Sequence, residues 1–190
     1  GGGMERVLHV AFRLAMSRRR HLTVVDKANV LETSRFWREI AQQLAPQYPE
    51  VELDFMFVDN AAMQIIRQPT HFDVIVTENM FGDILTDEAS VISGSLGMLP
   101  SASVGSEIAL FEPIHGSYPQ AAGKNIANPM AAILSAAMLL EHLGLTAEGS
   151  AVRDAVNRAL TEGIVTEDLA AQGKRRYSTS EVGDFIAAHI

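Results

Sequence analysis

The sequence has no cysteine, so it offers neither a disulfide framework nor thiol chemistry. It also lacks a long hydrophobic run, because the longest one, at residues 129–140, is too short and too rich in alanine to span a bilayer. No signal peptide is visible. Positive charge is in deficit, with 15 lysine and arginine residues against 23 acidic ones, and the net charge of −8 argues against a broad nucleic-acid-binding surface. We therefore expect a cytoplasmic globular protein that binds neither nucleic acid nor a membrane.

What the sequence does have is an alternation of short β-prone runs with segments of helical periodicity. Strands are expected at residues 21–25, 51–58, 73–77 and 108–114, and helices at 7–15, 33–44, 61–67, 81–92, 129–143, 151–160 and from 178 onward. This alternation is typical of an α/β fold with a mostly parallel sheet flanked by helices. With 47% apolar residues, the chain can bury a substantial core.

The amino-acid composition changes at two places along the chain. The first three residues, Gly1, Gly2 and Gly3, look like a linker or a cloning scar, and we expect them to lie outside the fold. The second change comes at residues 93–97, Ser-Gly-Ser-Leu-Gly, and the chain stays rich in glycine and serine as far as residue 105. We interpret this stretch as the crossing between two structural regions, residues 4–93 and 94–190.

Two carboxylates, Asp83 and Asp87, stand four positions apart in a run that is expected to begin a helix. Like charges at this spacing share one helix face and repel by a few tenths of a kcal/mol. A divalent cation such as Mg²⁺, held by one or two carboxylates and by water, would explain the pair. A third acid, Asp59, follows the end of an expected strand. Taken singly, Asp59 could be a helix N-cap and Asp83 could complement a helix dipole, so the cluster is what favours a metal site.

Lys27 follows the apolar strand at residues 22–25 and is one of only three lysines in the chain. Most lysines are solvated surface residues. At a strand end near a cation, however, an amine can lose its proton readily enough to act as a base. Asn29 beside it could be a turn residue. Five histidines lack metal-ligand spacing, and no role is expected for them: His9, His21, His71, His142 and His189.

The loop at residues 115–125 has some features of a phosphate-binding P-loop but does not match one. Six residues separate its glycines instead of four, and Asn125 follows the lysine where Ser or Thr is required. The sequence also has no G-x-G-x-x-G fingerprint, so a Rossmann dinucleotide site is not supported. Asn128, Pro129 and Gly144 predict the N-cap, the first position and the end of a helix. A nucleotide could still bind the loop through backbone N–H groups.

Several runs together resemble the β-decarboxylating dehydrogenases of the isocitrate/isopropylmalate family, and within it the isopropylmalate branch. They are VDKANVLE at 25–32, FVDN at 57–60, NMFGDILTD at 79–87, GSLGMLPSA at 94–102, EPIHGS at 112–117 and ANP at 127–129. Their order and spacing all agree with the family, and the likeness covers nearly the whole chain after the glycines.

The resemblance implies a role for individual residues. It makes Asp59, Asp83 and Asp87 the ligands of Mg²⁺ or Mn²⁺, and Lys27 the residue that takes the proton from the substrate hydroxyl beside Asp59. It places Asn29 and Val30 near the substrate and the nicotinamide. Residues 4–93 then belong to a substrate, metal and dimerisation domain, and residues 94–190 to an NAD-binding domain. The implied NAD-binding residues are His115, Gly116, Ser117, Gln120 and Asn128.

The implied reaction is the oxidation of (2R,3S)-3-isopropylmalate by NAD and loss of CO₂, which gives 4-methyl-2-oxopentanoate for leucine biosynthesis. The family also implies a homodimer in which Lys27 and Asp59 serve an active site shared with the other subunit. D-malate, tartrate or isocitrate remain alternative substrates. A non-catalytic dimerisation or assembly module, packing through helices 33–44 and 81–92, is an alternative of another class.

The sequence departs from the family pattern in two respects. Family members are considerably longer, and the part without a counterpart here is N-terminal. In the family that part holds the arginines that bind the malate carboxylates, the tyrosine that reprotonates the product and the residues that recognise the isopropyl group. In addition, Gln120 stands where many NAD-dependent members have an aspartate. Because Ala121 and Ala122 follow it, in place of the lysine and tyrosine usual in NADP-dependent relatives, NAD is the expected cofactor.

Overall fold

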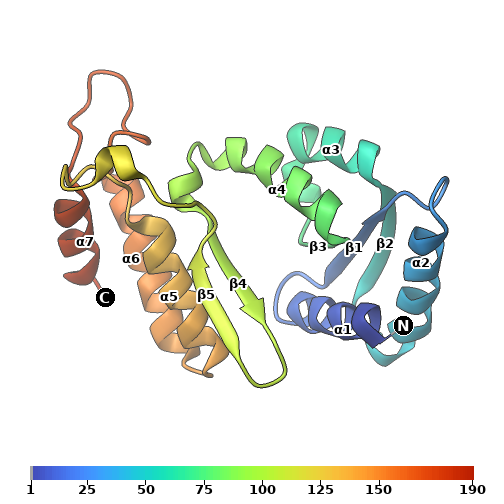
Figure 1. Cartoon of the computed structure of the whole chain (residues 1–190). Coiled ribbons are helices and arrows are strands. Elements are labelled where there is room, and N and C mark those ends of the chain that lie inside the picture. The colour runs from blue at the N-terminus through green and yellow to red at the C-terminus, as the bar shows by residue number, and fades with distance from the viewer. Residues whose placement is uncertain (1) are drawn as a thin grey trace. The chain divides into compact units, whose positions relative to one another are not determined.

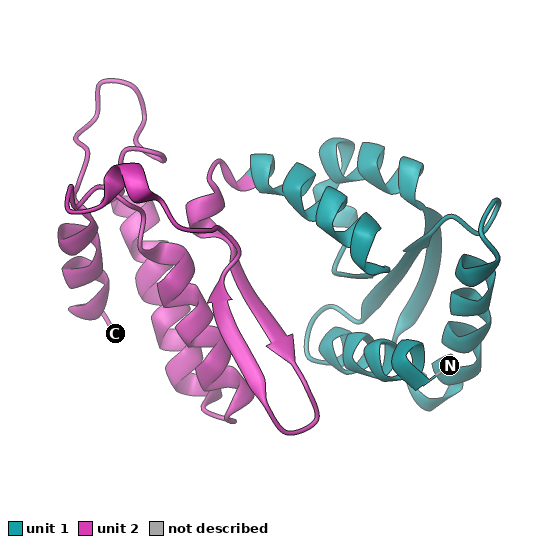
Figure 2. Ribbon diagram, in the orientation of Figure 1, with its two compact units in different colours: residues 1–92 teal, residues 93–190 magenta. Residues whose placement is uncertain are grey.

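The computed structural model describes residues 2–190 (Figure 1). The chain divides into two compact units, Gly1–Ile92 and Ser93–Ile190 (Figure 2). Within the described residues, no helix combines the length and the apolar character that crossing a membrane requires.

The first unit is built on a three-stranded parallel sheet. Strand β1 (His21–Asp26) lies between β2 (Glu52–Phe57) and β3 (Val74–Val76). In this register Leu22 is paired with Leu53 on one side and with Val74 on the other. The expected strands at these places and their parallel pairing are confirmed, and so is the α/β class.

Helices cover both faces of this sheet because the side chains of β1 alternate between them. Leu22 and Val24 join a core with helices α1 (Gly2–Met16) and α2 (Glu32–Leu44). Val25 points to the opposite face and packs with helices α3 (Val58–Arg67) and α4 (Asn79–Ser93). Nearly every position of β1 is therefore buried, which explains its continuous apolar run.

Two expectations for the first unit are wrong in detail. Gly2 and Gly3 belong to α1, whereas we expected them to lie outside the fold, and Gly1 lies outside the described residues. Helix α3 begins at Val58, three residues earlier than its periodicity predicts, with Phe57 at the N-cap. Asp59 is consequently not an N-cap but lies in the first turn, where its charge still complements the helix dipole.

The second unit begins with a hairpin that the sequence analysis missed in part. Strand β4 (Pro100–Val104) pairs antiparallel with β5 (Ala109–Pro113). The sequence analysis assigned β4 to the crossing between regions because Pro-Ser-Ala-Ser-Val has only one residue of high β propensity. Pairing with the expected strand β5 supplies the hydrogen bonds that the local sequence does not favour.

Three helices complete the second unit: α5 (Met130–His142), α6 (Thr146–Glu162) and α7 (Thr179–Ala187). They enclose a core centred on Met130, Val156 and Val182. Gly149 lets α5 and α6 approach closely, since a Cβ atom there would lie 2.7 Å from Glu141 Cγ. The capping box predicted for α7, with Ser178 and Glu181 bonded reciprocally, is confirmed.

Short 3-10 helices connect these elements within the described residues: Ala45–Gln47 (η1), Pro69–His71 (η2), Leu96–Met98 (η3) and Pro119–Ala121 (η4).

Candidate functional site

Lys27 and Asp59, the two residues with an expected catalytic role, lie in contact. Lys27 follows the last residue of β1, and Asp59 lies in the first turn of α3. The Lys27 Nζ atom donates a hydrogen bond of 2.8 Å to Asp59 Oδ1. That hydrogen bond lowers the pKa of Asp59, so the carboxylate stays charged at neutral pH. The first unit thus presents an ammonium and a carboxylate together at the carboxyl end of its central strand, the edge at which open α/β sheets bind ligands.

The turn that carries Lys27 is anchored by a buried ion pair. Asp26, with a side chain only 4% exposed, accepts two hydrogen bonds from Arg38 of α2, at 2.6 and 2.9 Å. Its Oδ1 atom also accepts the backbone N–H of Ala28 at 3.0 Å. The Lys27 N–H donates to Ser34 Oγ at 3.1 Å. These bonds fix the backbone on both sides of Lys27, although sequence reasoning assigned neither Arg38 nor Asp26 a role.

Asn29 and Val30 follow in the same turn, and both are exposed, with Val30 at 65% of its full accessibility. An apolar side chain this open has no partner in the core of the first unit. The turn therefore has an apolar and an amide side chain free for a ligand next to the Lys27 amine.

Asp83 and Asp87 lie four positions apart in α4, and both side chains are exposed. Glu78 occupies the helix start, where its carboxylate accepts the N–H groups of Met80 and Phe81 at 3.1 and 2.9 Å. The Asp87 carbonyl accepts the Ser90 hydroxyl at 2.6 Å, but neither the Asp83 nor the Asp87 carboxylate has a hydrogen bond or an ion pair among the described residues. The repelling pair consequently has no neutralising partner within the part of the chain that is described, and its oxygen donors suit a hard cation.

The structure does not gather the three expected metal ligands in one chain. Among residues 2–190, the only three potential ligand side chains whose donor atoms all lie within 4.8 Å of one another are His21, Asp54 and His71. Asp59 therefore does not join Asp83 and Asp87 at that distance.

A cavity of about 490 Å³ lies in the second unit. Four of the five residues expected to bind NAD line it, namely His115, Gly116, Ser117 and Asn128. Gln120 lies in η4, is exposed and is not among the lining residues. The other lining residues come from η3, the 115–128 loop and the segment before α7: Ser95, Leu96, Gly97, Tyr118, Ile126, Ala127, Glu167 and Asp168.

The Asn128 side chain is held in one orientation. The expected N-cap role of Asn128 is wrong by one position, because Pro129 is the N-cap and α5 begins at Met130. The Asn128 Oδ1 atom nevertheless accepts the Met130 N–H at 2.9 Å. The Nδ2 atom of Asn128 donates to Asp168 at 2.9 Å, which leaves one amide hydrogen for a ligand. A Cβ atom at Gly97 would lie 2.8 Å from Asn128 Cβ, so a larger residue there would displace the amide.

Asp168 accepts several hydrogen bonds at the wall of the cavity. The sequence analysis did not identify this residue. Besides Asn128, the hydroxyls of Ser95 and Thr166 donate to it, each at 2.5 Å. Partial burial acts to raise the pKa of Asp168, but these hydrogen bonds outweigh it and the pKa is lowered. The only sequence signal was an acid in a turn, which is too common to single out.

We predict that the free energy of unfolding falls less between pH 7 and pH 3 in Asp168→Asn than in the wild type. Because the folded-state pKa lies below the unfolded value of about 4, the Asp168 carboxylate stabilises the fold above that value, and the contribution is lost as the pH falls through the folded-state pKa. Denaturant unfolding at pH 7 and at pH 3 should therefore show a smaller pH-induced loss in the variant. Asp154→Asn, an exposed acid of α6, is the control. Equal losses in both variants and in the wild type would contradict this role.

Comparisons with known proteins agree with the geometry. The family model described as isocitrate/isopropylmalate dehydrogenase matches residues 2–186. A 3-isopropylmalate dehydrogenase of Bacteroides fragilis (strain YCH46) is 60% identical over 187 residues, and one of Geobacillus kaustophilus is 61% identical over 189 residues. Each match covers 98% of this chain, and 53% and 51% of the respective relative.

Solved structures show the same likeness. A β-decarboxylating dehydrogenase of Thermococcus kodakarensis, in its apo form, superposes with a TM-score of 0.90 at 42% identity, covering 99% of this chain and 55% of the other. An isocitrate dehydrogenase of Methylococcus capsulatus gives a TM-score of 0.90 at 40% identity, with 99% and 56% covered. The chain therefore belongs to the isocitrate/isopropylmalate dehydrogenase family. It spans about half the length of the curated relatives it matches.

Proposed function

We propose that the full-length protein is a cytoplasmic NAD-dependent 3-isopropylmalate dehydrogenase of leucine biosynthesis. It would oxidise (2R,3S)-3-isopropylmalate and release CO₂ to give 4-methyl-2-oxopentanoate. The observation that carries the proposal is the 2.8 Å contact between Lys27 and Asp59 at the carboxyl end of β1. Identities of about 60% to proteins named 3-isopropylmalate dehydrogenase support this substrate over isocitrate.

The exposed carboxylates of Asp59, Asp83 and Asp87 would hold Mg²⁺ or Mn²⁺. A bound divalent cation supplies charge stabilisation for the substrate oxygens, in both the oxidation and the enolate left by decarboxylation. Asp83 and Asp87 fit this role because they are unpaired on one helix face. Lys27 would accept the proton from the substrate 2-hydroxyl, since its amine is anchored by a rigid turn next to Asp59. Asn29 and Val30 would contact the substrate and the nicotinamide.

The cavity of the second unit would hold the adenosine end of NAD. Its volume of about 490 Å³ lies in the range of small-molecule sites. The acidic side chains of Glu167 and Asp168 disfavour a phosphate at that wall but suit a neutral base or ribose that donates hydrogen bonds. His115, Gly116, Ser117 and the free Asn128 amide hydrogen would make the polar contacts. Gln120 would act outside the cavity, toward the ribose.

A homodimer would complete the metal site. Asp59 does not gather with Asp83 and Asp87 in the described part of one chain, so we propose that Asp59 and Lys27 serve the site of the partner subunit. The surfaces of α3 and α4 suit such an interface, because several of their large apolar side chains are more than half exposed. They are Met63, Ile66, Ile84 and Val91.

Steady-state assays test this function. The full-length protein with Mn²⁺ should reduce NAD with 3-isopropylmalate faster than with isocitrate, D-malate or tartrate. The present chain by itself should show no turnover, because it spans only about half the length of the relatives it matches. Preference for another substrate would overturn the substrate assignment. Absence of turnover with all four would favour a non-catalytic assembly module instead.

We predict that Asp83→Asn weakens Mn²⁺ binding by about tenfold or more, because it removes one of few charged ligands. Calorimetric titration of the full-length protein measures this affinity. Asp184→Asn, an acid of α7 in the other unit, is the control. Unchanged Mn²⁺ affinity in Asp83→Asn would count against the assigned site.

A further inference from the structure

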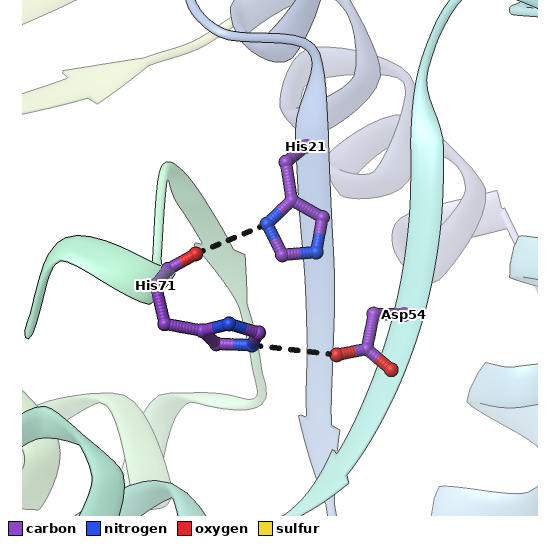
Figure 3. Close-up of side chains that lie close together, drawn as sticks. All are labelled: His21, Asp54 and His71. Atoms are coloured by element: carbon purple, nitrogen blue, oxygen red, sulfur yellow. Dashed lines mark hydrogen bonds and ion pairs between the residues drawn. The ribbon is translucent and has the colours of Figure 1, made fainter. Parts of the chain in front are cut away.

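We propose that His21, Asp54 and His71 form a second metal site, which binds a transition-metal dication of the zinc class. Sequence reasoning gave the two histidines no role because 50 residues separate them. The structure brings one donor atom of each of the three side chains within 4.8 Å of the others. Figure 3 shows the His71 ring directed across β1 toward the Asp54 carboxylate on β2, with the His21 ring nearby on β1. The proposal does not depend on the dehydrogenase function.

The topology places this cluster away from the proposed catalytic residues. His21 is the first residue of β1, whereas Lys27 follows its last residue. Asp54 is paired with Thr23 in the parallel register, so His21, Thr23 and Asp54 share one face of the sheet. His71 ends the 3-10 helix η2, just before β3. A metal here would join three segments at the amino end of the sheet.

Each side chain has a potential metal-ligating atom that makes no hydrogen bond. The Nδ1 atom of His21 lies 3.2 Å from the His71 carbonyl oxygen and must donate to it, so the Nε2 atom of His21 carries a free lone pair. Asp54 uses Oδ1 to accept the Phe55 N–H at 2.7 Å, while its Oδ2 atom lies 3.7 Å from His71 Nε2. A histidine whose other ring nitrogen donates to a carbonyl is the usual arrangement of a metal ligand.

The loop that carries His71 is held rigidly. Arg19 donates to the Thr70 carbonyl at 3.1 Å and to the Phe72 carbonyl at 2.5 Å. Together with the bond from His21 to the His71 carbonyl, three successive carbonyls are fixed. A loop that is already fixed loses less conformational entropy when a metal binds. A cluster that forms on a surface by chance does not need such support. Thr23, fully buried on the same face, has a hydroxyl with no hydrogen-bond partner in the described chain.

Two imidazoles and one carboxylate select the class of ion. Imidazole ligands suit zinc and its neighbours, whereas Mg²⁺ prefers oxygen donors. In tetrahedral zinc sites, ligand atoms at 2.0–2.2 Å from the metal lie about 3.3 Å apart. The present spread of up to 4.8 Å closes to that value by side-chain rotation, since Asp54 and His71 are each about 40% exposed. Three protein ligands would leave the fourth position to water.

Calorimetric titration with Zn²⁺ tests the proposal on protein without a histidine tag, in excess Mg²⁺ to occupy sites built from oxygen donors. We expect one equivalent to bind at micromolar concentrations. His71→Asn should weaken binding by about tenfold or more. The exposed His142→Asn should bind like the wild type, and it controls for the loss of a histidine. Titration with Co²⁺ should give visible absorption bands of a four- or five-coordinate ion, which His71→Asn loses.

His71 lies at the end of an exposed turn, so its substitution is not expected to unfold the protein. Circular dichroism checks this, and Zn²⁺ should raise the melting temperature of the wild type and of His142→Asn but not of His71→Asn. Equal Zn²⁺ affinity in wild type and His71→Asn would overturn the site. So would the absence of one-equivalent binding by the wild type, since the cluster would then be a set of hydrogen bonds only.

Discussion

Lys27→Ala in the full-length protein is expected to lower kcat by about 10²- to 10⁴-fold, the usual contribution of a positioned acid or base. The Lys27 amine lies 2.8 Å from Asp59, on a backbone fixed by Asp26 and Ser34. The substitution removes the proposed proton acceptor and leaves the carboxylates of the metal site in place. Steady-state kinetics with 3-isopropylmalate, together with Mn²⁺ titration, should therefore show lost turnover with retained metal affinity.

Lys27→Arg distinguishes the role of Lys27 as a base from its role as a positive charge. Arginine can keep the ion pair with Asp59, but it stays protonated and cannot accept a proton, so it should be nearly as inactive as Lys27→Ala. Lys174→Ala removes an exposed lysine of the second unit and should be fully active. If Lys27→Arg retained most of the activity, Lys27 would serve as a positive charge and not as the base.

Arg38→Ala is expected to destabilise the protein by about 3–5 kcal/mol, because it leaves the buried carboxylate of Asp26 without its cation. The Asp26 side chain is 4% exposed and accepts both hydrogen bonds from Arg38. The guanidinium also lies over the rings of Phe55 and Phe57, at 5.2 and 5.0 Å from their centroids. Denaturant unfolding measures the loss.

A surface ion pair provides the matched control for Arg38. Arg158 and Glu162 lie one turn apart on α6 and are both about half exposed, so Arg158→Ala should cost only about 0.3–0.5 kcal/mol. Equal losses in the two variants would mean that the Asp26–Arg38 pair does not organise the turn that carries Lys27.

The sequence predicted the parts of the fold in which local pattern and tertiary packing agree. The apolar run of β1 and the capping box at Ser178 are such places, and both are confirmed. Strand β4 was missed because its residues have little β propensity, and it forms only through pairing with β5. The start of α3 was placed too late because Val58, its first residue, continues the apolar run of the strand before it.

For the site, too, residues in contiguous motifs were predicted, and residues that meet through long-range contacts were not. The proposed roles of Lys27, Asp59, Asp83 and Asp87 came from contiguous motifs. Asp168 reaches Ser95 across 73 residues, and no local pattern marks that contact. The cluster of His21, Asp54 and His71 likewise depends on strand register and loop placement. Spacing along the chain does not predict which distant side chains meet.

The most direct test of the shared active site is subunit complementation in the full-length protein. Lys27→Ala and Asp83→Asn should each be inactive alone. In a mixed dimer, one site combines Lys27 of one chain with Asp83 of the other, while the second site lacks both. Random mixing should therefore restore roughly a quarter of the wild-type rate of NAD reduction. Failure of verified mixed dimers to regain activity would contradict an active site built from Lys27 and Asp59 of one subunit and Asp83 and Asp87 of its partner.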